Sequence, residues 1–143
     1  MNIRPITPAY AVSPQIDPED LPAIAAAGYA TVINNRPDAE NPPSHQSAAM
    51  DAAAKAAGVR IVHLPVTHQT LNGDTVAAQL EACRATEGPV LAYCASGTRS
   101  TIVWALGEAG TRPTDEIISL AAEQGYDLSQ MRPQLEAFAQ QKG

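Results

Sequence analysis

Short hydrophobic segments alternate with longer helical segments along this chain, and proline and glycine mark most of the boundaries between them. Three of the short segments, 30–34, 59–66 and 89–94, are rich in Val, Ile and Leu. Such runs are typical of strands that are buried on both faces of a sheet. Strands that alternate with helices become parallel neighbours, because a parallel pair needs a long crossover. The alternation therefore predicts an α/β fold, with a central, mostly parallel sheet and helices on both faces.

The boundaries of the helices follow from capping residues and glycines. Asp17 and Pro18 suit the start of a helix, and Gly28 and Gly58 suit the ends of two helices. The opening segment 6–15 is expected to hold one or two short edge strands. The helices are expected at 17–28, 44–58, 73–88, 100–109, 114–124 and 128–141.

Composition and charge exclude several other classes of protein. The 143 residues include 15 acidic and 9 basic ones, and the net charge of −6 disfavours an extended nucleic-acid footprint or a polybasic membrane surface. Two cysteines cannot form a disulfide framework, and no apolar run is long enough to span a membrane. The first residues lack the apolar stretch of a signal peptide. We therefore expect one cytoplasmic domain over residues 1–143, with neither nucleic acid nor membrane as a partner.

The loop 94–100 carries the clearest chemical signal, because it joins a hydrophobic strand to a helix. Gly97 allows an unusual φ, so successive N–H groups can turn inward and bind an anion together with the N-terminus of the helix. Arg99, in the first helical turn, can hold the same anion with its planar fork. Cys94 lies in the same positive field and is expected to be a nucleophilic thiolate. Contacts to the substrate are predicted for Ala95, Ser96, Gly97 and Thr98.

A thiolate that faces an anion cradle suits a small anionic substrate with an electrophilic centre, either a phosphate ester or a sulfane donor such as thiosulfate. The second cysteine, Cys83, lies near helical spacing from Val76 and Leu80 and is expected in the core, with a resolving thiol as the alternative. Three histidines and two cysteines show no metal-ligand spacing, so neither a metal nor a cofactor is expected.

The order of strand, cysteine, small-residue loop, Arg-Ser and helix resembles the active-site loop of the cysteine-dependent phosphatases and of the rhodaneses. Together with the segments 32–38 and 63–66, nearly the whole chain from Ile6 to the final helix resembles the bacterial DUF442 family. This resemblance implies a dual-specificity-phosphatase-like fold. It also implies a persulfide dioxygenase or sulfide-oxidation partner, because members of the family occur fused to persulfide dioxygenase domains.

The resemblance also assigns roles to polar residues outside the loop. Arg36 and Asp38 belong to the family's Arg-Pro-Asp segment, so they are expected to line the rim of the site or to hold its loop in place. Asp38 is in addition the candidate for a substitute proton donor. His68 lies where the phosphatases keep their acid, and it is expected to contact the substrate.

Two departures from the phosphatases determine the predicted reaction. Four residues separate Cys94 from Arg99, as in rhodanese loops, whereas the phosphatases have five. The segment 65–69 has no carboxylate to protonate an alkoxide leaving group, a loss of about 10²–10⁴-fold in rate, whereas sulfane transfer needs no acid. We therefore predict a rhodanese-type sulfurtransferase that passes sulfur from a Cys94 persulfide to a thiol, with Arg99 holding the donor and Ser100 hydrogen-bonded to the sulfur. A tyrosine or dual-specificity-like phosphatase that forms a Cys94 phosphocysteine, and a non-catalytic anion- or persulfide-binding module, are the alternatives.

Overall fold

A computed structural model of the chain describes residues 2–67 and 69–142. Five strands form one sheet: β1 (Arg4–Thr7), β2 (Tyr10–Ser13), β3 (Thr31–Asn34), β4 (Arg60–His63) and β5 (Val90–Tyr93). Their order in the sheet is β1-β2-β5-β3-β4. Strand β1 is antiparallel to β2, and the other neighbouring pairs are parallel. The predicted, mostly parallel sheet is therefore confirmed.

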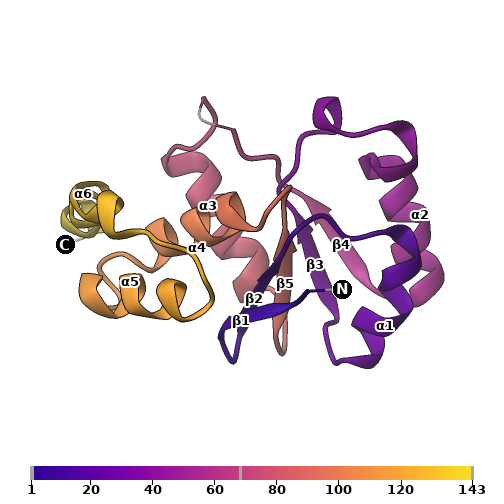
Figure 1. The fold of residues 1–143 in the computed structure, drawn as a ribbon, viewed down its shortest axis with the longest axis horizontal. Helices are drawn as coiled ribbons and strands as arrows, with labels where there is room; N and C mark the ends of the chain where they lie inside the picture. Colours follow the sequence, from indigo (N-terminus) through magenta and orange to yellow (C-terminus); the bar gives the residue numbers. More distant parts are fainter. Residues whose placement is uncertain (1, 68, 143) are drawn as a thin grey trace.

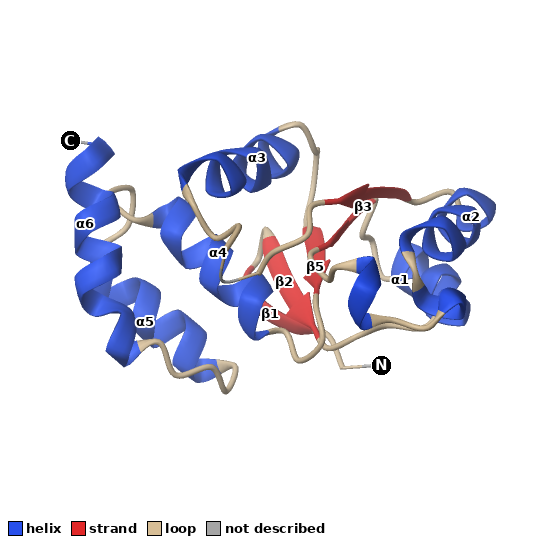
Figure 2. Ribbon diagram, turned by 90° about the horizontal axis from the view of Figure 1, so that it is seen from above, coloured by secondary structure: helices blue, strands red, loops and turns tan. Residues whose placement is uncertain are grey.

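Helices cover both faces of this sheet. Figures 1 and 2 show α1 (Leu21–Ala26) and α2 (Ser47–Ala57) on one face, and α3 (Gly73–Arg84) and α4 (Thr98–Glu108) on the other. The last two helices, α5 (Thr114–Glu123) and α6 (Arg132–Lys142), lie beyond α4, at the end of the molecule opposite α2. The predicted layers are confirmed.

Residues along the inner strands alternate between two hydrophobic clusters, one on each face of the sheet. In β5, Val90 and Ala92 belong to the cluster that includes residues of α3, α4 and α5, whereas Leu91 and Tyr93 belong to the cluster beside α1 and α2. All four are at most 1% exposed. Burial on both faces explains why the residues of β5 do not alternate between apolar and polar.

The parallel strands end at one level, so the residues that follow them lie side by side. Ser13 and Asn34 both pair with Tyr93, and Asn34 also pairs with His63. The chain therefore leaves four strands at one edge of the sheet, the upper edge in Figure 1. Ligands of open α/β sheets bind outside this carboxyl edge.

The opening segment forms a hairpin, of which only β1 lies at an edge. The expectation of edge strands is therefore wrong for β2, which lies between β1 and β5. Pro8 and Pro14 flank β2 without interrupting it, so the strand keeps the N–H groups that an inner position requires. Among the described helices, none has the length and the apolar character that crossing a membrane requires.

Candidate active site

The loop after β5 folds its backbone around the Cys94 sulfur. Cys94 is fully buried, and its Sγ accepts a hydrogen bond from the N–H group of Gly97 at 3.1 Å. Gly97 has a φ of 94°, a left-handed conformation that favours glycine, and α4 begins at the next residue. The N–H group and the helix N-terminus therefore present to the sulfur the polarity that stabilises an anion.

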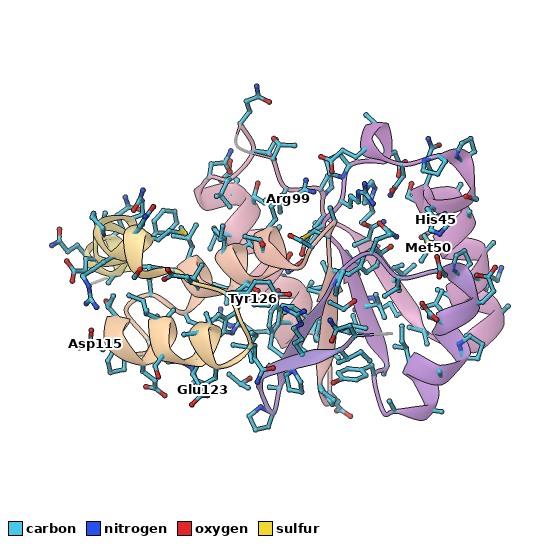
Figure 3. The ribbon with its side chains drawn as sticks, in the orientation of Figure 1. His45, Met50, Arg99, Asp115, Glu123 and Tyr126 are labelled. Carbon is cyan, nitrogen blue, oxygen red and sulfur yellow. The ribbon has the colours of Figure 1, made fainter. Side chains whose placement is uncertain are left out.

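A tyrosine from the C-terminal part of the chain holds this loop from outside. Tyr126 lies after α5, and its hydroxyl donates a hydrogen bond to the carbonyl oxygen of Ser96 at 3.0 Å (Figure 3). A Cβ atom on Gly97 would overlap this hydroxyl. Glycine is therefore required at position 97 by the backbone conformation and by the close approach of Tyr126. Because 30 residues separate Tyr126 from Ser96, local sequence pattern gives no signal for this contact.

The guanidinium of Arg99 holds a carboxylate. Its Nη1 donates to Oε2 of Glu40 at 2.8 Å and its Nη2 donates to Oε1 at 2.7 Å, the paired contact that guanidinium groups make with carboxylates and phosphates. Nη1 also donates to the carbonyl oxygen of Val66 at 3.0 Å. The hydrogen bonds to Glu40, and to a smaller extent the nearby Cys94, raise the pKa of Arg99. The same pairing lowers the pKa of Glu40.

Glu40 lies between two arginines, at the end of the short 3₁₀ turn Asp38–Glu40 that follows β3. Arg36 donates from Nε to Oε1 of Glu40 at 3.4 Å and from Nη2 to the Glu40 carbonyl oxygen at 3.1 Å. Its Nη1 donates to Oε1 of Gln15 at 3.1 Å. The structure thus places Arg36 at the rim of the site. Glu40 is absent from the predicted site residues, although a carboxylate in a polar segment at the carboxyl end of a strand is a signal that could have found it.

An open cavity of about 280 Å³ lies beside the pair of Arg99 and Glu40. The other residues that line it are Val66, Thr67, Leu71 and Ile102. Three of these four side chains are apolar, so an anion-binding fork adjoins an apolar wall.

Ser100 belongs to a buried network and not to the sulfur. Its hydroxyl donates to Oδ1 of Asn35 at 2.9 Å, which corrects the prediction of a hydrogen bond to Cys94. The Nδ2 of Asn35 donates to Oε1 of Gln79 at 2.9 Å, and the Nε2 of Gln79 donates to the hydroxyl of Tyr10 at 3.0 Å. The network closes where this hydroxyl donates to the carbonyl oxygen of Ser100 at 2.8 Å. It therefore ties the first turn of α4 to β2, α3 and the residue after β3.

Asp38 fixes the start of α2. Its Oδ1 accepts a hydrogen bond from the N–H of Ser47 and its Oδ2 accepts one from the Ser47 hydroxyl, both at 2.7 Å. These hydrogen bonds lower the pKa of Asp38. Both oxygens are engaged away from Arg99, which corrects the idea of Asp38 as a substitute proton donor and favours its structural alternative.

The other residues predicted to bind substrate lie at the mouth of the loop. Ala95, Ser96 and Thr98 are exposed, and the Ser96 hydroxyl donates to Oγ1 of Thr98 at 2.9 Å. His68, the predicted contact from the neighbouring loop, lies outside the described residues.

Cys83 packs against the hydrophobic cluster that includes residues of α3 and α4. Burial raises its pKa to about 11, so it is a neutral thiol near pH 7 and a poor resolving nucleophile. Across residues 2–67 and 69–142, no group of three or more His, Cys, Asp or Glu side chains is placed to hold a metal ion.

The chain is similar to proteins described as phosphatase-like. A family model described as "Beta-lactamase hydrolase-like protein, phosphatase-like domain" matches residues 2–111. A beta-lactamase hydrolase-like protein from Xylella fastidiosa (strain 9a5c) is 35% identical over 141 residues, which are 97% of this chain and 33% of the relative. The chain therefore spans about a third of the length of the curated Xylella relatives that it matches.

Solved structures of similar fold carry phosphatase descriptions. A proposed phosphatase from Neisseria meningitidis is 34% identical with a TM-score of 0.85, and the match covers 96% of this chain and 99% of that chain. TpbA from P. aeruginosa, whose variant has been solved in complex with pTyr, is 19% identical with a TM-score of 0.67, over 96% of this chain and 82% of that chain. These likenesses confirm the phosphatase-like fold.

These findings contradict the predicted rhodanese-type sulfur transfer and favour its phosphatase alternative. The prediction depended on the four-residue spacing between Cys94 and Arg99 and on the absence of a carboxylate from the segment 65–69. The fold instead brings the carboxylate of Glu40 to Arg99 from the segment after β3. The persulfide intermediate is therefore contradicted as well, and these comparisons give no support to the expected persulfide dioxygenase or sulfide-oxidation partner.

Proposed function

The chain belongs to the family of beta-lactamase hydrolase-like phosphatase domains, and from this membership we propose that it hydrolyses phosphoric monoesters through a Cys94 phosphocysteine. One observation carries the proposal: the fork of Arg99 makes two hydrogen bonds to a carboxylate beside the Cys94 loop. The same fork can hold two oxygens of a phosphoryl group, because its planar geometry suits carboxylates and phosphates alike.

The proposed reaction has two steps at Cys94. In the first, the Cys94 thiolate attacks phosphorus, an S–P bond forms, and the P–O bond to the substrate's alcohol breaks. In the second, water attacks the phosphocysteine, the S–P bond breaks, and inorganic phosphate leaves while the thiolate is restored. The loop N–H groups and Arg99 stabilise charge on the phosphoryl oxygens in both transition states.

The cavity beside Arg99 supports a particular substrate class. Val66, Leu71 and Ile102 form an apolar wall next to the fork. A phosphate carried by an aromatic group would bury its ring against this wall while its oxygens contact Arg99. The phosphotyrosine complex of TpbA, a protein of the same fold, is in line with this class. We therefore propose aryl phosphates, phosphotyrosine included, as substrates.

We propose further that residues 1–143 act as one catalytic domain. Tyr126 lies beyond the residues 2–111 that match the family model, and it supports this proposal because its hydroxyl hydrogen-bonds the loop at Ser96. Helices α5 and α6 would then stabilise the loop instead of forming a separate unit.

Hydrolysis of 4-nitrophenyl phosphate by the wild-type chain and by Cys94→Ser tests the proposed function. We expect kcat/KM to fall by more than about 10³-fold in the variant, because it lacks the nucleophile of the first step. Cys83→Ser is the matched control and should retain wild-type turnover. Full turnover by Cys94→Ser, or sulfur transfer from thiosulfate without any turnover of aryl phosphates by the wild type, would overturn the proposal.

A further inference from the structure

In the described part of the chain, one carboxylate lines the cavity at the proposed phosphate site. Glu40 lines the cavity beside Arg99, and its two oxygens occupy the two Nη atoms that a phosphoryl group would need. Its side chain is 37% exposed, so it can move without disturbing the core. Figure 3 shows Arg99, its partner, at the carboxyl edge of the sheet where the loops after the strands meet.

We propose that Glu40 is the proton donor to the leaving group, held by Arg99 in the resting site and released when a phosphoryl group takes its place. This inference rests on the proposed function and adds a catalytic residue to it. It supplies the acid that the segment 65–69 lacks. Asp38, two residues earlier, cannot do so because both of its oxygens bind Ser47.

The exchange of partners at Arg99 lets the Glu40 carboxylate take up a proton from the solvent when substrate binds. Among residues 2–67 and 69–142, the charged groups that face Glu40 are Arg99 and Arg36, and both lower its pKa in the resting site. When a phosphate dianion takes over Arg99, Glu40 loses its strongest hydrogen bonds and gains a negative neighbour. Both changes raise the pKa of a carboxyl group. Arg36 keeps its hydrogen bond to the Glu40 carbonyl oxygen at 3.1 Å, which holds the turn beside the cavity.

The proton balance of the two steps then closes on one residue. As the ester P–O bond breaks, the protonated carboxyl of Glu40 donates its proton to the leaving oxygen, so a neutral alcohol departs. As water attacks the phosphocysteine, the Glu40 carboxylate accepts a proton from that water. When phosphate leaves, Glu40 releases to the solvent the proton that it took up at the start, and Arg99 binds the carboxylate again.

Glu40→Gln, assayed on two substrates, tests the assignment. We expect kcat/KM, which reports the steps up to formation of the phosphocysteine, to fall by about 10²–10³-fold on phenyl phosphate, whose phenoxide needs a proton, and far less on 4-nitrophenyl phosphate, whose leaving group is stable without one. Hydrolysis of the phosphocysteine is common to both substrates, so loss of the Glu40 base in that step lowers kcat on both. Inorganic phosphate should bind several-fold more tightly to Cys94→Ser/Glu40→Gln than to Cys94→Ser, because a neutral amide competes less well for Arg99. Glu123→Gln removes an exposed acid on α5 and is the matched control.

The outcomes separate this inference from the proposed function. A wild type that turns over both substrates, with a loss of kcat/KM in Glu40→Gln that is far larger on phenyl phosphate than on 4-nitrophenyl phosphate, supports the proton donor. An active wild type with equal losses of kcat/KM on both substrates, or with no loss, overturns the role of Glu40 as proton donor and leaves the proposed phosphatase activity intact. A wild type that hydrolyses neither substrate overturns both.

Discussion

Two groups of side chains flank the Cys94 loop, one charged and partly exposed, the other neutral and buried. The charged group consists of Arg36, Glu40 and Arg99, whose side chains are 20%, 37% and 25% exposed. Water screens such ion pairs, so each contributes only about 0–1 kcal/mol to stability. A pair that is held this weakly can exchange one partner for a ligand, and this group is therefore suited to bind and release an anion.

The neutral group cannot exchange partners in this way. Asn35 and Ser100 are 0% exposed, Gln79 is 2% exposed and Tyr10 is 4% exposed, so their hydrogen bonds are made away from water. A buried polar group that loses its partner costs about 1–3 kcal/mol. The charged group therefore provides the chemistry and the buried group provides the rigidity. Substitutions in the charged group should lower activity, and substitutions in the buried group should lower stability.

Arg99→Lys should give the largest effect and should act on activity. A lysine keeps the charge but cannot make the two parallel hydrogen bonds of the fork, so we expect kcat/KM on 4-nitrophenyl phosphate to fall by about 10²–10³-fold. The free energy of unfolding in urea should change by less than about 1 kcal/mol. Arg132→Lys is the matched control, because Arg132 makes exposed ion pairs with Asp115 and Glu136 outside the site. A loss of stability without a loss of activity would contradict the role of Arg99 in binding the phosphoryl group.

Asn35→Leu should act chiefly on stability. The substitution leaves the Ser100 hydroxyl and the Gln79 amide without their partner at Asn35, and we expect the free energy of unfolding to fall by about 1–3 kcal/mol. The activity that remains in the folded protein should fall less than in Arg99→Lys. Urea unfolding and assays below the transition measure the two effects, and Gln130→Leu, at an exposed amide, is the control. An unchanged midpoint would contradict the assigned role of this network.

The sequence predicts the part of the site that is local and misses the part that depends on tertiary contacts. Cys94, Gly97 and Arg99 lie within one strand–loop–helix unit, so their juxtaposition follows from six consecutive residues. Glu40 reaches Arg99 across 59 positions and Asn35 reaches Ser100 across 65, and no local period records either contact. The fold class was predictable because burial on both faces leaves its pattern in the inner strands β3 and β5, where every residue is buried.

The sequence pointed to Asp38 and not to Glu40 as the candidate proton donor, because the direction of each side chain in a short turn cannot be inferred from the local sequence. The two acids are separated by one residue in a 3₁₀ turn, where residues i and i+2 project in different directions because three residues complete each turn. One carboxylate therefore meets Ser47 at the start of α2, while the other meets Arg99. A sequence can place an acid in this segment, but the geometry of the turn decides which acid enters the site.

Asp38→Asn should give the smallest effect. Asp38 is charged, like the group of Arg36, Glu40 and Arg99, but both of its oxygens are held by hydrogen bonds from Ser47. Hydrogen bonds from Ser47 lower the pKa of Asp38 in the folded state, so its carboxylate stabilises the fold above the usual pKa of about 3.9, and this contribution is lost as the pH falls through the lowered value. The difference in unfolding free energy between wild type and Asp38→Asn should therefore shrink between about pH 6 and about pH 3. Ser47→Ala should show the same convergence with a smaller amplitude, because it removes the hydroxyl that donates to Oδ2 and keeps the N–H group that donates to Oδ1. Urea titrations of the wild type and both variants at the two pH values measure these differences in unfolding free energy. A difference that stays constant with pH would show that Asp38 stabilises the fold through the shape of its side chain and not through its charge.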